Sequence, residues 1–200
     1  MGAATEYPRH YDQMIRTIHW LTLLLIASIY AAAWAAHSGL AGDWYRSVMQ
    51  LHRSFGVSVW VLTVLRLVWR SRTVIPELPG DLHPLQKLAA GVNEALLYLL
   101  LLFQPLLGLL QTNARGQTVE LFFLVDLPAV ISPDRPLARL LHDLHAIAAN
   151  ALLILIALHA AAALFHHFVR RDNVLDAMLP ARLRGVGRAG FALERAKRQT

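Results

Sequence analysis

Residues 144–168 read LHAIAANALLILIALHAAAALFHHF, a run without a single acidic or basic side chain apart from histidine. The run exceeds the roughly 20 residues that a helix needs to cross about 30 Å of hydrocarbon. It contains His145 and His159, fourteen positions apart. At about 100° and 1.5 Å per residue, the two imidazoles fall on nearly one helix face, roughly 21 Å apart. Because polar side chains are costly inside a bilayer, the stretch predicts a membrane helix with two functional positions, one toward each membrane face.

Three further apolar runs precede this one and are long enough to cross a membrane. They cover residues 14–36, 47–69 and 88–110. Of the 200 residues, 56% are hydrophobic and only 16% are charged, which is too few for the surface of a soluble domain of this size. Backbone polar groups in lipid must be satisfied internally, so runs of this length are expected to be helices. The sequence therefore predicts an all-α membrane protein, a four-helix antiparallel bundle.

The connections divide the chain into one bundle domain and a tail. The domain is expected to cover residues 1–180, and residues 181–200 form a basic tail. The longest connection, residues 113–139, contains an apolar segment at 120–127 that is too short to span the membrane. That segment is expected to lie at the membrane interface or to cap the bundle.

The distribution of lysine and arginine predicts the orientation of the bundle. With both termini in the cytoplasm, fourteen basic residues lie on the cytoplasmic side and five on the other, which favours an N-in, C-in topology. The five outer residues are Arg46, Arg53, Arg115, Arg135 and Arg139. The apolar faces of the helices are expected to contact membrane lipid.

This orientation assigns a depth to each of four histidines. His19 lies near the inner face and His52 near the outer face, while His145 is outer and His159 is inner. Two pairs at matched depths, His52 with His145 and His19 with His159, suit two six-coordinate haems, each iron held from both axial sides. Zinc also accepts imidazole, but a tetrahedral site needs ligands close to one metal, and the two histidines of one helix are too far apart for that.

Other histidines and one carboxylate remain as alternatives. His142 could replace His145, and His166 could compete with His159, because each lies on nearly the same helix face as its rival. Glu94 lies inside the third span, where it would relay protons, bond a ligand or sit among lipid headgroups. His10, His37 and His83 are expected in loops or at the terminus, and His167 is a weaker candidate ligand.

The basic side chains next to the histidines allow two interpretations. Arg16 lies one turn before His19, and Arg53 directly follows His52. Either arginine would pair with a haem propionate or extend to the membrane interface.

Composition excludes several other classes of function. The chain has no cysteine, which excludes disulfides, iron–sulfur clusters, c-type haem attachment and thiolate metal sites. The net charge of +6 does not indicate nucleic-acid binding, because the basic tail lacks interleaved aromatic residues.

Several short motifs resemble the bacterial cytochrome b561 family of four-helix membrane cytochromes with two b-type haems. The motifs are Ile18-His19-Trp20, LHRSFG at residues 51–56, Leu144-His145, and LHAAAALFHH at residues 158–167 followed by Arg171-Asp172-Asn173. A weaker match is Asn113-Ala-Arg-Gly, and the resemblance covers residues 7–180. In the family the four matching histidines are the axial ligands, and the match favours His159 over His166. One departure is Glu94, which stands where the family often has a histidine.

The resemblance implies an oxidoreductase that exchanges electrons with membrane quinone. Some similar proteins oxidise superoxide at the periplasmic face and reduce ubiquinone. The expected function is therefore electron transfer from a periplasmic one-electron donor, with superoxide as the first candidate, through two haem b groups to ubiquinone. The outer arginines, among them Arg53, Arg115, Arg135 and Arg139, would steer the superoxide anion or serve as ordinary loop charges.

Two other functions stay open on the residues alone. The chain could be a haem-containing anchor subunit that relays electrons from a soluble dehydrogenase. It could also be a transporter that uses its histidines to carry protons. The oligomeric state, the catalytic residues and the quinone site are not indicated by the sequence.

Overall fold

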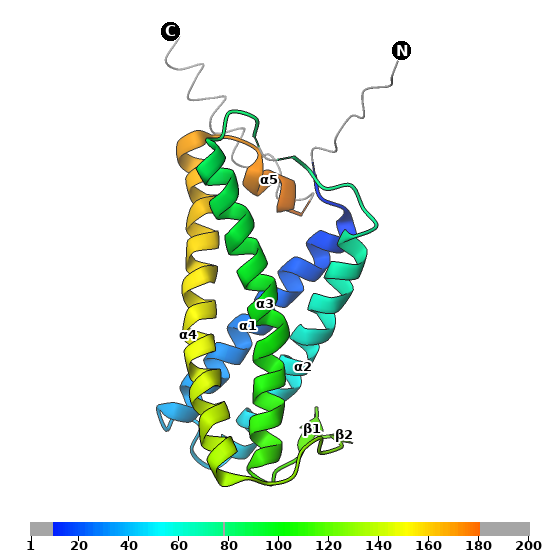
Figure 1. The fold of residues 1–200 in the computed structure, drawn as a ribbon, viewed down its shortest axis with the longest axis vertical. Helices are drawn as coiled ribbons and strands as arrows, with labels where there is room; N and C mark the ends of the chain where they lie inside the picture. The colour runs from blue at the N-terminus through cyan, green and yellow to red at the C-terminus, as the bar shows by residue number, and fades with distance from the viewer. Residues whose placement is uncertain (1–9, 78, 181–200) are drawn as a thin grey trace.

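A computed structural model describes residues 10–77 and 79–180 of the chain. Four long helices run along the length of the molecule (Figure 1). They are α1 (Gln13–His37), α2 (Tyr45–Arg70), α3 (Pro84–Ala114) and α4 (Arg135–Phe165). Each of the four is long and apolar enough to cross a membrane, so the predicted four-helix membrane fold is confirmed. The expected basic tail lies outside the described residues.

Shorter elements join and extend the long helices. A 3-10 turn, η1 (Gly42–Trp44), leads into α2, and a π-helical turn, η2 (His166–Arg170), continues α4. The small helix α5 (Val174–Met178) follows it. Two strands, β1 (Val119–Leu121) and β2 (Val125–Leu127), connect α3 to α4.

Specific side chains set where three of the long helices begin. The Asp12 carboxylate accepts from the Met14 backbone N–H at 2.8 Å and so caps α1. His83 and Gln86 form a reciprocal capping box at the start of α3, and Asp134 accepts from Leu137 N–H at the start of α4. Such caps satisfy backbone donors that a first helical turn leaves unpaired.

Two of the helices extend well beyond the spans that hydrophobicity marks. α4 begins at Arg135, nine residues before the expected 144, and α3 runs past the expected 88–110 at both ends. Hydropathy identifies the part of a helix that is apolar, whereas caps decide where the helix begins. The Asp134 cap and the proline in the first turn of α4 start that helix before its apolar run.

The connection between α3 and α4 contains an antiparallel hairpin that the sequence analysis missed. β1 pairs with β2, with Glu120 opposite Asp126. Its turn holds Phe122 and Phe123 at φ 49° and 62°, a left-handed conformation that usually requires glycine or asparagine. Ser54 of α2 holds the hairpin, since its Oγ accepts from Phe122 N–H at 2.9 Å and donates to the Glu120 carbonyl at 3.3 Å. The hairpin therefore covers one end of the bundle beside α2 (Figure 1).

The four long helices pack as two helical hairpins. α1 packs mainly on α2, and α3 mainly on α4, with a smaller contact between α2 and α3. A central apolar layer of Val59, Leu101 and Leu152 joins the two hairpins. α5 closes the end where α1 begins: the Trp20 Nε1–H donates to the Met178 carbonyl at 3.0 Å, and Tyr11 N–H donates to Ala177. The beginning of α1 and the end of α4 thus share one end of the bundle, called the inner end here after the predicted orientation.

Candidate functional site

The four candidate histidines form two pairs, one toward each end of the bundle. His19 of α1 faces His159 of α4, with ring centroids 6.3 Å apart and ring planes at 60°. His52 of α2 faces His145 of α4, again with 6.3 Å between centroids and 60° between planes. We call these the inner pair and the outer pair. Each pair joins the α1–α2 hairpin to α4, as the matched depths in the sequence predict.

The common spacing of 6.3 Å fits two imidazoles on opposite sides of one metal ion. A bond from a first-row metal to an imidazole nitrogen is about 2.0 Å, and that nitrogen lies about 1.15 Å from the centre of its own ring. Two rings that hold one metal in line therefore have centroids about 6.3 Å apart. Edge-to-face ring contacts also occur at centroid spacings of about 4.5–7 Å, so the spacing is compatible with a metal between the rings and with direct ring contact.

Residues seven positions apart on three helices lie in three successive layers along the bundle. On α4 these are His145, Leu152 and His159; on α2 they are His52, Val59 and Arg66; and on α3 they are Gly108, Leu101 and Glu94. The middle member of each set belongs to the central apolar layer. Seven residues are close to two full turns, which returns each helix to nearly the same face. The outer layer and the inner layer thus lie on either side of the central apolar layer.

The outer pair borders a cavity of about 620 Å³. The His52 Nδ1 lies 3.1 Å from the Ile29 carbonyl, which can only accept, so Nδ1 carries the proton and Nε2 is left as the free lone pair. Histidines that bind metals commonly donate their other N–H in this way. Gly108 also belongs to this site, because a Cβ there would lie 3.2 Å from His145 Cε1. Because Gly108 has no side chain, the His145 ring can occupy this space.

The inner pair has a different environment. His159 is exposed, as are Ala160, Ala161 and Ala162 that follow it on α4. An imidazole exposed at this depth of a bilayer is costly, so the arrangement suits a large apolar ligand that covers the ring. The small alanine side chains leave room for a flat ligand beside α4.

Arg66 and Tyr98 supply the polar groups of the inner layer. The positive charge of Arg66 acts on both rings of the inner pair. Its guanidinium carbon lies 5.5 Å from the centre of the Tyr98 ring. The Nε of Arg66 and the hydroxyl of Tyr98 are both buried, and neither has a hydrogen-bond partner. The sequence analysis counted Arg66 only as a topology signal; its seven-residue spacing from Val59 is the sequence feature that places it in the core.

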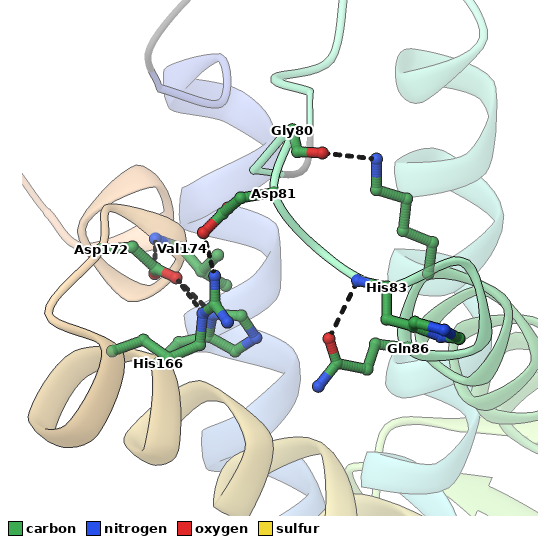
Figure 2. A network of polar contacts seen from close by, with 9 residues as sticks. Gly80, Asp81, His83, Gln86, His166, Asp172 and Val174 are labelled. Carbon is green, nitrogen blue, oxygen red and sulfur yellow. Dashed lines mark hydrogen bonds and ion pairs between the residues drawn. The ribbon is translucent and has the colours of Figure 1, made fainter.

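The competing histidines have other partners. The Nδ1 of His142 lies 3.2 Å from the amide nitrogen of Gln111. His166 points to Asp172, with 2.6 Å between Nδ1 and Oδ2, in a network that also contains Arg170 and Asp81 (Figure 2). Partial burial of Asp172 disfavours its charge, yet hydrogen bonds from His166, Val174 N–H and Arg170 keep the pKa of that carboxyl below its usual value. The structure therefore brings His145 and His159, rather than these neighbours, to the paired positions.

Three charged residues considered in the sequence have ordinary protein partners. Glu94 forms a two-point ion pair with Arg70, with N–O distances of 2.9 and 3.1 Å. Arg16 donates to the Leu179 carbonyl at 3.0 Å through Nη1. Arg53 donates to Gln50 and Gln117, each at 2.9 Å. Among the histidines expected in loops, His83 instead caps α3 and His37 ends α1.

The described residues contain no cluster of three or more His, Asp or Glu side chains that could hold a metal ion. A tetrahedral zinc site needs such a cluster, whereas a porphyrin supplies four nitrogens itself and asks the protein only for the two axial ligands. The donor set of each pair therefore fits haem and does not fit zinc.

Comparison with known sequences agrees with this chemistry. Residues 10–181 match the family described as prokaryotic cytochrome b561. Cytochrome b561 homolog 2 of Escherichia coli K12 is 31% identical over 179 residues, which cover 88% of this chain and 94% of that protein. The probable superoxide oxidase CybB of Yersinia pestis is 33% identical over 166 residues, covering 82% of this chain and 92% of that protein.

A third relative, cytochrome b562 of Cereibacter sphaeroides, is 35% identical over 135 residues, with 66% of this chain and 68% of that protein covered. The matched region contains all four paired histidines and all four membrane-spanning helices. With a family match over most of its length and relatives above 30% identity, the chain belongs to the prokaryotic cytochrome b561 family, a group of haem b electron-transfer proteins of bacterial membranes.

Proposed function

We propose that this chain carries electrons through the bacterial inner membrane by means of two haem b groups. His19 and His159 are the axial ligands of the inner haem, and His52 and His145 those of the outer haem. The observation that supports this assignment is the common 6.3 Å centroid spacing of both pairs. One such pair could arise from packing, whereas two pairs with the same geometry, fourteen residues apart on α4, indicate a repeated metal site.

The side chains of the protein hold, separate and insulate the two sites. Haem b, when bound, supplies one-electron redox chemistry. α4 sets the two sites roughly 21 Å apart by its rise of about 1.5 Å per residue. Val59, Leu101 and Leu152 form an apolar layer between them. If His19 with His159 and His52 with His145 each held a haem, oxygen species would find no free position on the metal, and a small donor would react at the edge of the site.

We further propose superoxide as the donor at the outer end and membrane ubiquinone as the acceptor. A cavity of about 890 Å³ near the outer pair is lined by Arg115, Arg135 and Arg139, with His142 beside them. Asp134 and Asp143 also line it, and three arginines against two carboxylates leave an excess of positive charge that favours anions. A relative in Yersinia pestis bears the name probable superoxide oxidase. Two superoxide anions would each lose one electron and become O₂, and the quinone would take both electrons and two protons.

Haem content tests the ligand assignment. The purified chain should contain two haems and show a reduced absorption band near 560 nm, as b-type cytochromes do. Each of His19→Ala, His52→Ala, His145→Ala and His159→Ala should retain one haem. The matched controls His142→Ala and His166→Ala should retain two. Loss of a haem from either control, with retention in the variant of its rival, would reject the pairing.

Pulse radiolysis tests the donor. Superoxide generated in the presence of the oxidised protein should reduce haem, and the rate should fall as salt screens the arginines of the outer cavity. A protein that stays oxidised with superoxide, but is reduced by a copurifying dehydrogenase, would instead be an anchor subunit. A colourless protein would reject the electron-transfer proposal as a whole.

A further inference from the structure

Arg66 is a partly buried cation with which no carboxylate of the described residues forms an ion pair. Its Nε is buried and without a hydrogen-bond partner, and none of the described carboxylates forms an ion pair with it. The residue lies seven positions after Val59, so it faces the same interior space as the central layer. A partly buried guanidinium without an ion-pair partner is costly, so an anion other than the described side chains is expected beside it.

The neighbouring charges do not supply that partner. Glu94 lies in the same layer as Arg66, but both of its carboxylate oxygens bind the guanidinium of Arg70. Arg16, at the same end of the bundle, is itself a cation and donates to the Leu179 carbonyl. The Tyr98 hydroxyl, next to Arg66, is a second buried group without a partner. A guanidinium and a phenol hydroxyl on two side chains in contact form a donor pair suited to a carboxylate.

We propose that Arg66 and Tyr98 form a carboxylate-binding corner of the inner site and there hold a propionate of the inner haem. This inference rests on the proposed function, because it needs a haem between His19 and His159. Arg–carboxylate pairs are among the stronger hydrogen-bonded contacts in proteins, and here the pair is partly withdrawn from water. The positive charge also favours the reduced state of the iron, which carries one positive charge less than the oxidised state.

The outer site places its cations differently, because Arg53 and Arg115 line the cavity at the outer pair. Its layer places His52 on α2 where the inner layer has Arg66, and Gly108 on α3 where the inner layer has Glu94. The adjacent cation Arg53 is already bound to Gln50 and Gln117.

Redox titration of the full-length protein tests the proposal. The variants are Arg66→Gln, Arg66→Lys, Tyr98→Phe and, as a matched control, Arg72→Gln, which removes an exposed charge just beyond the same end of α2. Each is made in the parent and in a His145→Ala background, where only the inner haem remains. The readouts are haem content and the fraction reduced at fixed applied potentials, followed at the 560 nm band.

Arg66→Gln should lower the reduced-to-oxidised ratio of the inner haem at least tenfold at a fixed potential, which corresponds to about 59 mV for one electron. Arg66→Lys should restore most of that ratio, Tyr98→Phe should cause a smaller loss, and Arg72→Gln should change nothing. Loss of the inner haem from Arg66→Gln, with retention in Arg66→Lys, also supports the proposal.

The proposal is overturned if Arg66→Gln keeps the inner haem with an unchanged ratio, or if Arg66→Gln and Arg66→Lys lose it alike. A failure of the proposed function would look different. In that case His145→Ala would not reduce the haem content from two to one, whatever the Arg66 variants do.

Discussion

The outer and inner sites have the same ring spacing but differ in what α2 and α3 place beside the rings. In the outer layer α3 contributes Gly108, whose missing side chain makes room for His145, and the Ile29 carbonyl fixes the tautomer of His52. In the inner layer the same faces carry the charged residues Arg66 and Glu94. At the same two helix positions, the outer layer thus leaves space for a ring, whereas the inner layer places charged side chains. The comparison teaches that one repeated helix spacing can place two similar histidine pairs among different neighbouring side chains.

A side chain at Gly108 should have the largest effect on the difference between the two sites. A Cβ at this position already lies 3.2 Å from His145 Cε1, so the branched side chain of Gly108→Val would displace the ring. We expect the protein to lose the outer haem and keep the inner one, measured as haem per chain. The control is Gly91→Val on the same helix, where a Cβ meets no atom within 4 Å. Equal loss from both variants would mean that the helix, rather than the site, was damaged.

Truncation in the central layer should show whether the two sites are coupled through it. Leu152 is 5% exposed and packs with Val59 and Leu101. Leu152→Ala should lower the free energy of unfolding by about 2–5 kcal/mol, as for other large-to-small changes in a core. Both haems should remain bound at moderate temperature, and both should be released at the same lower temperature on heating. Release of one haem well before the other would show that the sites unfold independently.

Removal of the hydroxyl that holds the hairpin should affect the outer end alone. Ser54 is completely buried and accepts from Phe122 N–H. Ser54→Ala leaves that N–H without its partner and should cost about 1 kcal/mol. Amide hydrogen exchange should quicken in residues 119–127 and stay unchanged in α5. Unchanged exchange in the hairpin would indicate that Phe55–Phe122 packing, rather than the hydroxyl, holds it in place.

Acidification should produce the smallest effect, confined to the inner end. The Asp12 carboxylate accepts from Trp69 Nε1–H at 2.9 Å, and this hydrogen bond lowers the pKa of Asp12 below its ordinary value of about 3.9. A carboxyl with a lowered pKa stabilises the folded state above its unfolded pKa and loses that contribution as pH falls through its folded pKa. Asp12→Asn should therefore be less stable than the parent at pH 7, and the difference should shrink toward pH 3.

Detergent-induced unfolding followed by helix content measures this difference. Asp43→Asn, at the exposed start of η1, is the matched control and should differ little from the parent at either pH. A gap between the parent and Asp12→Asn that stays constant down to pH 3 would show that the Asp12 charge is not the source of the stabilisation.

The sequence was sufficient to predict the helices and the histidine pairs because both depend on the spacing of residues along a helix and on the lysine and arginine residues near the helix ends. Fourteen residues between His145 and His159 place both rings on one face, and antiparallel connections assign the depths of His19 and His52. The hairpin was not predictable in the same way. Its turn uses two phenylalanines with positive φ, and a serine on a distant helix holds it in place.

The charged residues of the inner layer show a second limit of sequence reasoning. Glu94 remained open between a proton relay and a headgroup contact because its partner, Arg70, lies on another helix. Arg66 was counted with the topology signals, since an arginine near a helix end is usually exposed to headgroups. Only the packing of α2 against α3 reveals that its Nε is buried beside Tyr98.

The seven-residue spacing on α2, α3 and α4 fixes the distance between neighbouring layers along each helix. One residue inserted between His145 and His159 would turn one ring by about 100° relative to the other and direct it out of the core. The same insertion would break the match with α2 and α3, which keep the same count. The distance that an electron must travel therefore cannot be adjusted in small steps; it can change only by whole repeats made together in three helices.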